Sequence, residues 1–477
     1  MLEAERAEHR AQIAERDAQI AEQAAQIALL TEQVAKLTEL LNRNSKNSHL
    51  PPSSDGPGSS AGTRPSGRRA KSGRKRGGQK GRRGKRRELL PVDKVDEFID
   101  LFPAACEGCA RRLPEVPDID ARRYQQVDLR DHRPHVTEWR RHEVDCPHCG
   151  TSTRAAYDET KLPRFAFGPC LTAVVAMLTG AYHLSRRKTQ RLLLELFGIT
   201  VSLGSISAME KRASDALASA HDEALREVQY ARVKHTDATT WTRSGSLMAL
   251  WTLASAAATA YQIVADGCRA TILPFFGPCL GFLVSDRATV FGFWAMSLRQ
   301  VCWAHLLRKF VAFSERDGPA GALGRELCQL GALMFEYWHG FKEGMLSRDE
   351  LALWLRPVQR DIERLLERGE HAGIDRLSGS CADILAHRDA LWTFVTEDGV
   401  EPTNNHAELE LRDFVLWRKR SFGSQSERGE RFAERVMTAV RTARKQGKDV
   451  LDFLVQSVLA HQNGAPAPRL IDASAVA

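Results

Sequence analysis

Apolar residues recur every seven positions along the first forty residues of the chain. One heptad position is filled by Ile13, Ile20, Ile27, Val34 and Leu41. Because this stretch contains neither proline nor glycine, the pattern predicts a single helix and a coiled coil over residues 1–43. A coiled coil predicts a homo-oligomer, and a helical hairpin within one chain is the alternative.

The spacing of apolar residues is helical again between residues 161 and 229. One helix is predicted to begin after Ser185, a typical N-cap, and to end at Gly198, and another to begin near Leu203. Two helices joined by a short turn form either a helix-turn-helix that reads DNA or a pair of scaffold helices. Both interpretations remain open at this point.

The pattern changes to short strands between residues 230 and 299. Three consecutive strands, a helix and a fourth strand are predicted, because β-prone runs alternate there with turn residues. This order matches the start of a ribonuclease-H-like fold. Adjacent strands of an open sheet would then place Asp237, on the first strand, beside Asp286, at the end of the fourth.

The rest of the chain is predicted to be mostly helical. Residues 300–400 read as a helical insertion, residues 401–463 as the second part of the core, and residues 464–477 as a tail. The core would therefore be interrupted between Asp286 and Glu408.

Charge is concentrated in one stretch. The net charge is +8, and thirteen Lys or Arg residues with no acid lie between Arg64 and Arg87. Residues 44–90 are therefore predicted to be a flexible basic linker that binds DNA without reading its sequence, and a solubilising tail is the alternative. The predicted DNA contacts are Arg68, Arg69, Lys71, Arg74, Lys75, Arg76, Lys80, Arg82, Arg83, Lys85, Arg86 and Arg87.

Two Cys-x-x-Cys pairs lie in residues 91–160. Cys106 with Cys109 and Cys146 with Cys149 predict one structural four-thiolate zinc site in a small β domain. Unrelated thiols are the alternative, as is His148 in place of one cysteine.

The cysteines also bear on the location of the protein. Ten cysteines in 477 residues do not resemble a disulfide framework, and the charged first ten residues do not resemble a secretory signal. The longest apolar run, Leu171–Tyr182, is too short and too polar to span a bilayer. These features predict a cytoplasmic protein associated with nucleoid DNA.

Three carboxylates are the candidate catalytic residues. Asp237, Asp286 and Glu408 could hold two magnesium ions, for which manganese can substitute, and such a pair supports phosphoryl transfer on DNA. Spacing alone does not select them from the other acids. The competing acids nearby are Asp266, Glu401, Glu410 and Asp413.

Several motifs, taken in order, resemble one known family. They are NRNSKNSHLPPSSDGP, SGRKRGGQKG, the two cysteine pairs, FAFGPCLTAV, ITVSLGSI, KHTDATTW, LVSDRATVF, VCWAHLLRKF, PTNNHAELELR and WRKRSFGSQSE. From about residue 42 to residue 453, the chain is similar to bacterial transposases of the insertion-sequence 66 family.

The resemblance implies a DDE-type transposase that acts on terminal inverted repeats, with Asp237, Asp286 and Glu408 as the triad. It also implies accessory proteins encoded by the element. The chain departs from the family pattern at Ala238 and Leu409, which follow the first and third of these acids. The resulting fold class is multidomain α+β, with a coiled coil, a zinc-binding β domain, and a ribonuclease-H-like α/β core that carries a helical insertion.

Cys302 and His305, in the CWAH motif, are also typical of the family. They would either organise the active site or act as a buried cysteine and a capping histidine. Two other functions remain open: an inactive or domesticated zinc-containing DNA-binding regulator, and a nuclease that cuts DNA without joining it.

Overall fold

The protein is represented by a computed structural model that describes residues 89–118, 121–127, 134–156 and 163–472, with a few single positions and short runs between residues 16 and 38. Those early positions are helical, in agreement with a helix there, and the coiled coil itself stays a prediction. The basic run from Arg68 to Arg87 lies outside the described residues.

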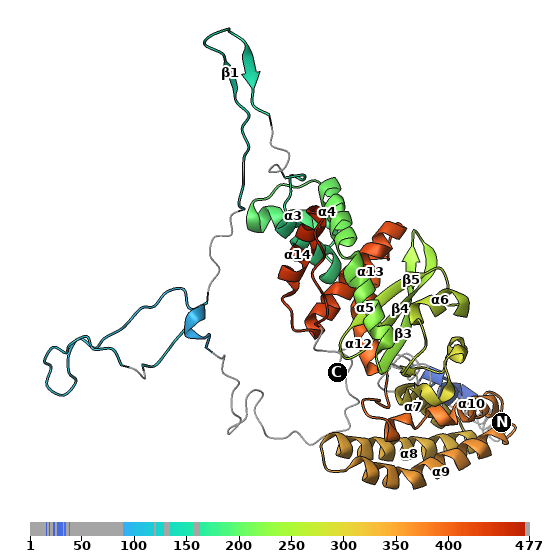
Figure 1. Ribbon diagram of the computed structural model, residues 1–477. Helices are drawn as coiled ribbons and strands as arrows, with labels where there is room; N and C mark the ends of the chain where they lie inside the picture. The colour runs from blue at the N-terminus through green and yellow to red at the C-terminus, as the bar shows by residue number, and fades with distance from the viewer. Residues whose placement is uncertain are drawn as a thin grey trace, which may run out of the picture.

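A five-stranded sheet forms the centre of the described structure (Figure 1). Its strands lie in the order β5-β4-β3-β6-β7; β4 is antiparallel to β3 and β5, whereas β6 and β7 run parallel to β3. The four predicted strands and the helix between the third and fourth are confirmed. The elements are β3 (Val233–Arg243), β4 (Ser246–Ala254), β5 (Thr259–Val264), α6 (Arg269–Phe276), β6 (Phe282–Ser285), the 3-10 turns η5 (Thr289–Phe293) and η6 (Met296–Leu298), and β7 (Arg299–Val301).

The fifth strand corrects the sequence prediction, which began the helical region at Gln300. All three residues of β7 are buried, although two of them are polar. Arg299 donates to the carbonyl of Asp286 at 2.9 Å, and Gln300 donates to the carbonyl of Leu391 at 3.0 Å. Polar side chains can be buried in this strand because they form hydrogen bonds inside the fold. The strand therefore lacks the apolar residues by which a buried strand is recognised in a sequence.

The sheet is covered on both faces and along one edge (Figure 1). α12 (Asn405–Ser421) packs on one face, against Trp241 and Tyr261, while α5 (Ala218–Tyr230) and α6 cover the other. α13 (Glu427–Lys445) runs along the edge strand β5, and its side chains accept hydrogen bonds from the outward backbone N–H groups of that strand. This edge of the sheet therefore cannot pair with another strand. The three bonds join Thr259 N to Thr442 Oγ1, Tyr261 N to Thr438 Oγ1 and Ile263 N to Glu434 Oε1.

A helical layer formed by α2, α3, α4 and α14 packs beside α13. The predicted caps of α3 are confirmed: Ser185 accepts from Lys188 N, and Gly198 adopts a left-handed φ of 66°. α4 packs against α2, α13 and α14, which favours the scaffold interpretation of the helix pair. The elements are α2 (Pro169–Ala176), the π-helix η4 (Met177–Ala181), α3 (Arg186–Phe197), α4 (Leu203–Ala216) and α14 (Val450–Gln462).

Apart from β7, the predicted insertion is helical and has a hydrophobic core of its own. That core reaches the sheet through Val284 and Val301. Its elements are α7 (Trp303–Ser314), α8 (Gly318–Lys342), α9 (Arg348–Glu370), α10 (Ser378–Leu385), η7 (Arg388–Ala390) and α11 (Thr393–Thr396).

The described residues between 89 and 156 contain little regular structure. They form the 3-10 turn η3 (Val92–Lys94) and an antiparallel hairpin of β1 (Glu143–Asp145) and β2 (Ser152–Arg154). In the described part of the chain, no helix is both long enough and apolar enough to cross a membrane.

Candidate active site

Asp237 and Asp286 lie at corresponding places on neighbouring strands. In the parallel pairing of β3 with β6, His235 is opposite Val284, and each aspartate follows two residues later. Asp286 comes directly after β6, and its carboxylate accepts from Ala288 N at 3.0 Å. The pairing predicted from the strand pattern is therefore the pairing that the fold makes.

Glu408 reaches the same end of the sheet from α12, where it lies in the first turn. The turn before this helix is tied to β3 by Asn404, whose side chain is buried. Asn404 donates from Nδ2 to the carbonyl of Thr236, the residue before Asp237, at 2.7 Å.

Cys302 connects this turn to the second aspartate. Its backbone N–H donates to the carbonyl of Ser285, the residue before Asp286, at 2.8 Å. Its thiol accepts from the backbone N–H of Asn404 at 3.2 Å, and the thiol is buried. A continuous chain of bonds thus links the two aspartates to the start of the helix that carries Glu408.

The three carboxylates influence one another electrostatically. Burial, together with the negative charges of Glu408 and Asp286, raises the pKa of Asp237 to about 7, against the opposing effects of the Ala238 N–H and of Arg308. Burial also raises the pKa of Glu408, while Arg308 lowers it from 3.6 Å away. This site is short of positive charge, and a bound cation would supply it.

Glu408 also faces the CWAH motif. Ligand atoms of Cys302, His305 and Glu408 lie within 4.8 Å of one another. Within the described residues, His305 Nδ1 and Glu408 Oε1 are buried atoms without a hydrogen-bond partner, 3.9 Å apart. Sulfur and imidazole suit a zinc-type ion, whereas magnesium prefers oxygen, so the magnesium candidates remain the carboxylates. Both CWAH residues therefore contact the candidate active site.

The sequence pattern did not identify Arg308 or Asn404. Arg308 follows His305 by three positions, which places both on one face of α7, and this spacing was the available signal. The competing acids are engaged elsewhere: Asp266 accepts from Cys268 N, Glu401 pairs with Lys342, Glu410 with Lys445, and Asp413 with Arg441.

Each cysteine pair forms the same tight turn. Cys106 O accepts from Ala110 N at 2.8 Å, and Cys146 O accepts from Gly150 N at 2.9 Å. Ala110 and Gly150 both adopt a left-handed φ, of 59° and 72°. The backbone N–H of Gly108 lowers the pKa of Cys106, which favours a thiolate.

The structure does not bring the two turns together. The hairpin of β1 and β2 carries the second pair, and it lies apart from the segment that carries the first pair (Figure 1). Within the described segments, Cys106, Cys109, Cys146 and Cys149 form no single cluster of ligand atoms. The zinc site therefore stays a prediction, supported by the local turns.

Comparison with known proteins places the site within a family. The model of the family described as "Transposase IS66 family" matches residues 164–431, which include all three carboxylates. A family of unknown function (DUF6444) matches residues 3–88. An uncharacterised protein of Sinorhizobium fredii (strain NBRC 101917 / NGR234), y4qI, is 28% identical over 176 residues, or 35% of this chain and 32% of that protein. The chain thus matches about a third of the length of this relative.

The raised pKa of Asp237 predicts a pH-dependent stability in EDTA. The folded protein keeps the proton of Asp237 up to about pH 7, whereas the unfolded chain loses it near the ordinary aspartate pKa of 3.8. The free energy of unfolding therefore falls as the pH rises from about 4 to about 7, because the unfolded chain releases the proton that the folded protein still holds. Asp237→Asn avoids this loss of stability, so its melting temperature should exceed that of the wild type increasingly toward pH 8.

Asp266→Asn is the matched control, because the backbone N–H of Cys268 lowers the pKa of Asp266. That variant should melt below the wild type at neutral pH. A difference between Asp237→Asn and wild type that does not change with pH would contradict the assigned pKa.

Proposed function

Since the chain belongs to the IS66 family of transposases, we propose that it binds the terminal inverted repeats of its insertion element and catalyses strand cleavage and strand transfer. The observation that carries this proposal is the convergence of Asp237, Asp286 and Glu408 at one end of the sheet. Structural ion pairs bring opposite charges together, whereas this site gathers like charges.

The proposed site fits two magnesium ions. Three carboxylates supply hard oxygen ligands and leave coordination positions for water and phosphate. Asp237 would contact both ions, Asp286 one of them and Glu408 the other. When bound, the ions would activate the attacking oxygen and stabilise the leaving 3′-oxygen.

The protein's own groups would orient this chemistry. Asn404 and Cys302 fix the backbone on both sides of the site, and both are buried. Arg308 lies 3.6 Å from Glu408 and would hold that carboxylate in position while contributing positive charge near the reacting phosphate.

The sheet supports a ribonuclease-H-like core for this DDE-type enzyme. The sequence predicted that fold from three consecutive strands, a helix and a fourth strand, and β3, β4, β5, α6 and β6 follow one another in this order. An inactive DNA-binding regulator is less well supported, because all three carboxylates are present at the same end of the sheet.

The remaining parts complete the proposal. The basic linker would hold double-stranded DNA, the coiled coil would pair two chains so that both element ends are held, and the two cysteine turns would share one structural zinc ion. The enzyme would act on DNA in the bacterial cytoplasm, together with accessory proteins of the element.

Glu408→Gln tests the catalytic proposal on DNA that carries the element's ends. Gln keeps the shape of the side chain and removes the charge that would hold a cation, so magnesium-dependent cleavage and joining should fall by about 100-fold or more. DNA binding should be unchanged in a mobility-shift assay.

Glu401→Gln is the matched control, because Glu401 pairs with Lys342 of the insertion. It should cleave like the wild type. Equal cleavage by wild type and Glu408→Gln would exclude Glu408 from the chemistry.

The zinc proposal predicts one zinc ion per chain. Cys106→Ser and Cys146→Ser should each lose it, because four thiolates are shared by one ion. Elemental analysis of the purified protein measures this, with the exposed Cys268→Ser as control. Zinc retained in full after either substitution in the pairs would show that the pairs do not share a site.

A further inference from the structure

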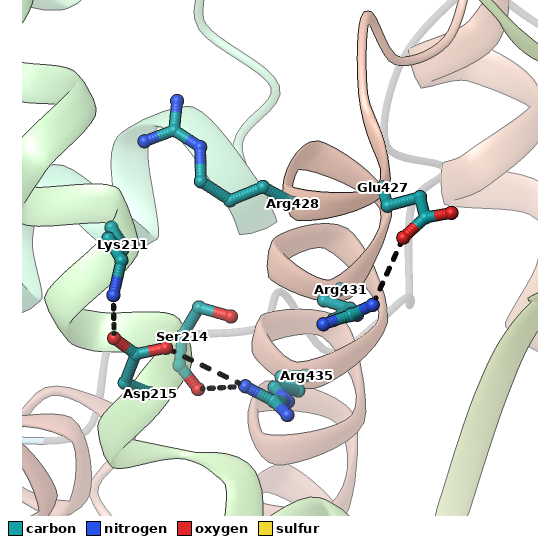
Figure 2. A pocket seen from close by; sticks show the side chains of 7 residues that line it. All are labelled: Lys211, Ser214, Asp215, Glu427, Arg428, Arg431 and Arg435. Atoms are coloured by element: carbon teal, nitrogen blue, oxygen red, sulfur yellow. Dashed lines mark hydrogen bonds and ion pairs between the residues drawn. The ribbon is translucent and has the colours of Figure 1, made fainter.

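An open basic pocket of about 380 Å³ lies between α4 and α13, outside the candidate active site (Figure 2). Its lining carries four cationic and two anionic side chains, an excess of two positive charges. The cations are Lys211, Arg428, Arg431 and Arg435, and the anions are Asp215 and Glu427.

Two of the arginines join the helices on either side. Arg428 donates to Ser207 Oγ at 2.7 Å, and Arg435 donates to the carbonyl of Ser214 at 3.1 Å. These bonds run from α13 to α4 and hold both guanidinium groups in place at the walls of the pocket. Figure 2 shows the bond from Arg435 to Ser214. The pocket is therefore preorganised.

Each acid of the pocket is shared between two cations. Asp215 lies 2.6 Å from Lys211 and 3.9 Å from Arg435. Glu427 lies 3.1 Å from Arg431 and 3.5 Å from Arg243, at the end of β3. The acids therefore do not neutralise the cations, and Arg431 stays 60% exposed at the opening.

An anion with several oxygens fits this arrangement. Guanidinium groups bind phosphate oxygens through paired N–H donors, and an open, polar pocket offers little to an apolar ligand. Because the pocket opens at the surface of α4 and α13, it can take a phosphate that belongs to a long polymer.

We propose that this pocket binds backbone phosphates of the DNA duplex on which the enzyme acts. The inference rests on the proposed function, and it adds a second contact site that orients the duplex relative to the carboxylates. Phosphate contacts of this kind position a protein on DNA without reading its sequence.

Strand β3 connects the carboxylates with one side of the pocket. Asp237 lies on β3, and Arg243, which contacts the pocket through Glu427, lies six residues farther along the same strand. Six residues of strand span about 20 Å, which is the rise of roughly six base pairs of DNA. A duplex that runs along β3 would therefore place the contacted phosphate about six base pairs from the cleaved bond.

Arg431→Ala and Glu427→Gln test the proposal in opposite directions. In EDTA, Arg431→Ala should bind the element's ends about ten-fold more weakly and lower the salt slope by about one. Glu427→Gln removes a negative charge from the pocket and should bind DNA more tightly, a gain that a folding defect cannot produce. Arg364→Ala is the matched control, since Arg364 is an exposed arginine of α9 that pairs with Asp361 at 3.3 Å.

A single uncharged methylphosphonate in the duplex tests the position. Placed about six base pairs from the cleaved bond, it should weaken binding by wild type and have no further effect on Arg431→Ala. Arg431→Ala and Glu427→Gln that both bind DNA like wild type would overturn the proposal.

A thermal-shift experiment with inorganic phosphate tests whether the pocket binds a free phosphate ion rather than a phosphate of the DNA backbone. Stabilisation of the wild type but not Arg431→Ala, with unchanged DNA binding, would assign the pocket to a small anion and overturn the proposal. If wild type cleaves DNA while the pocket variants bind normally, only this inference fails. If wild type neither binds nor cleaves the element's ends, the proposed function fails.

Discussion

The candidate active site depends on one buried chain of hydrogen bonds. It runs from Ser285 through the backbone N–H and thiol of Cys302 to Asn404, and from the Asn404 side chain to Thr236. All four residues are buried, so each broken bond would leave a polar group without a partner, at a cost of about 1–3 kcal/mol. Because Ser285 and Thr236 directly precede the two aspartates, this chain fixes where the carboxylates stand.

The same arrangement carries an electrostatic cost. Burial and two neighbouring carboxylates raise the pKa of Asp237 to about 7, and Arg308 offsets only part of this. Arg308 lies 3.6 Å from Glu408, whereas Glu410 and Asp413 lie 3.2 and 2.6 Å from Lys445 and Arg441. The charge of the three acids is therefore only partly compensated, which is better explained by a cation that binds during function.

The sequence predicted those helices and strands whose signals lie in neighbouring residues. The first four strands and the caps of α3 at Ser185 and Gly198 could be recognised, because alternation, turn residues and capping chemistry are written in adjacent positions. The expectation that Asp237 lies beside Asp286 came from the match of these strands to a ribonuclease-H-like fold, with one aspartate on the first strand and the other at the end of the fourth.

Features built from distant segments could not be predicted in this way. β7 has three residues, and its polar side chains are satisfied only by the folded chain. Asn404 gains its role from Thr236 and Cys302, which lie on separate strands or turns. The basic pocket is lined by residues of α4 and α13, which lie more than 200 positions apart in the sequence. Within each helix these charged residues form no pattern that indicates a pocket.

Anomalous diffraction from crystals soaked in manganese tests the central claim most directly. The account predicts two manganese peaks about 4 Å apart between the carboxylates of Asp237, Asp286 and Glu408. It also predicts the loss of at least one peak in Glu408→Gln. Fully occupied manganese elsewhere in the crystal, with no peak among these three residues, would contradict a metal-ion active site at this end of the sheet.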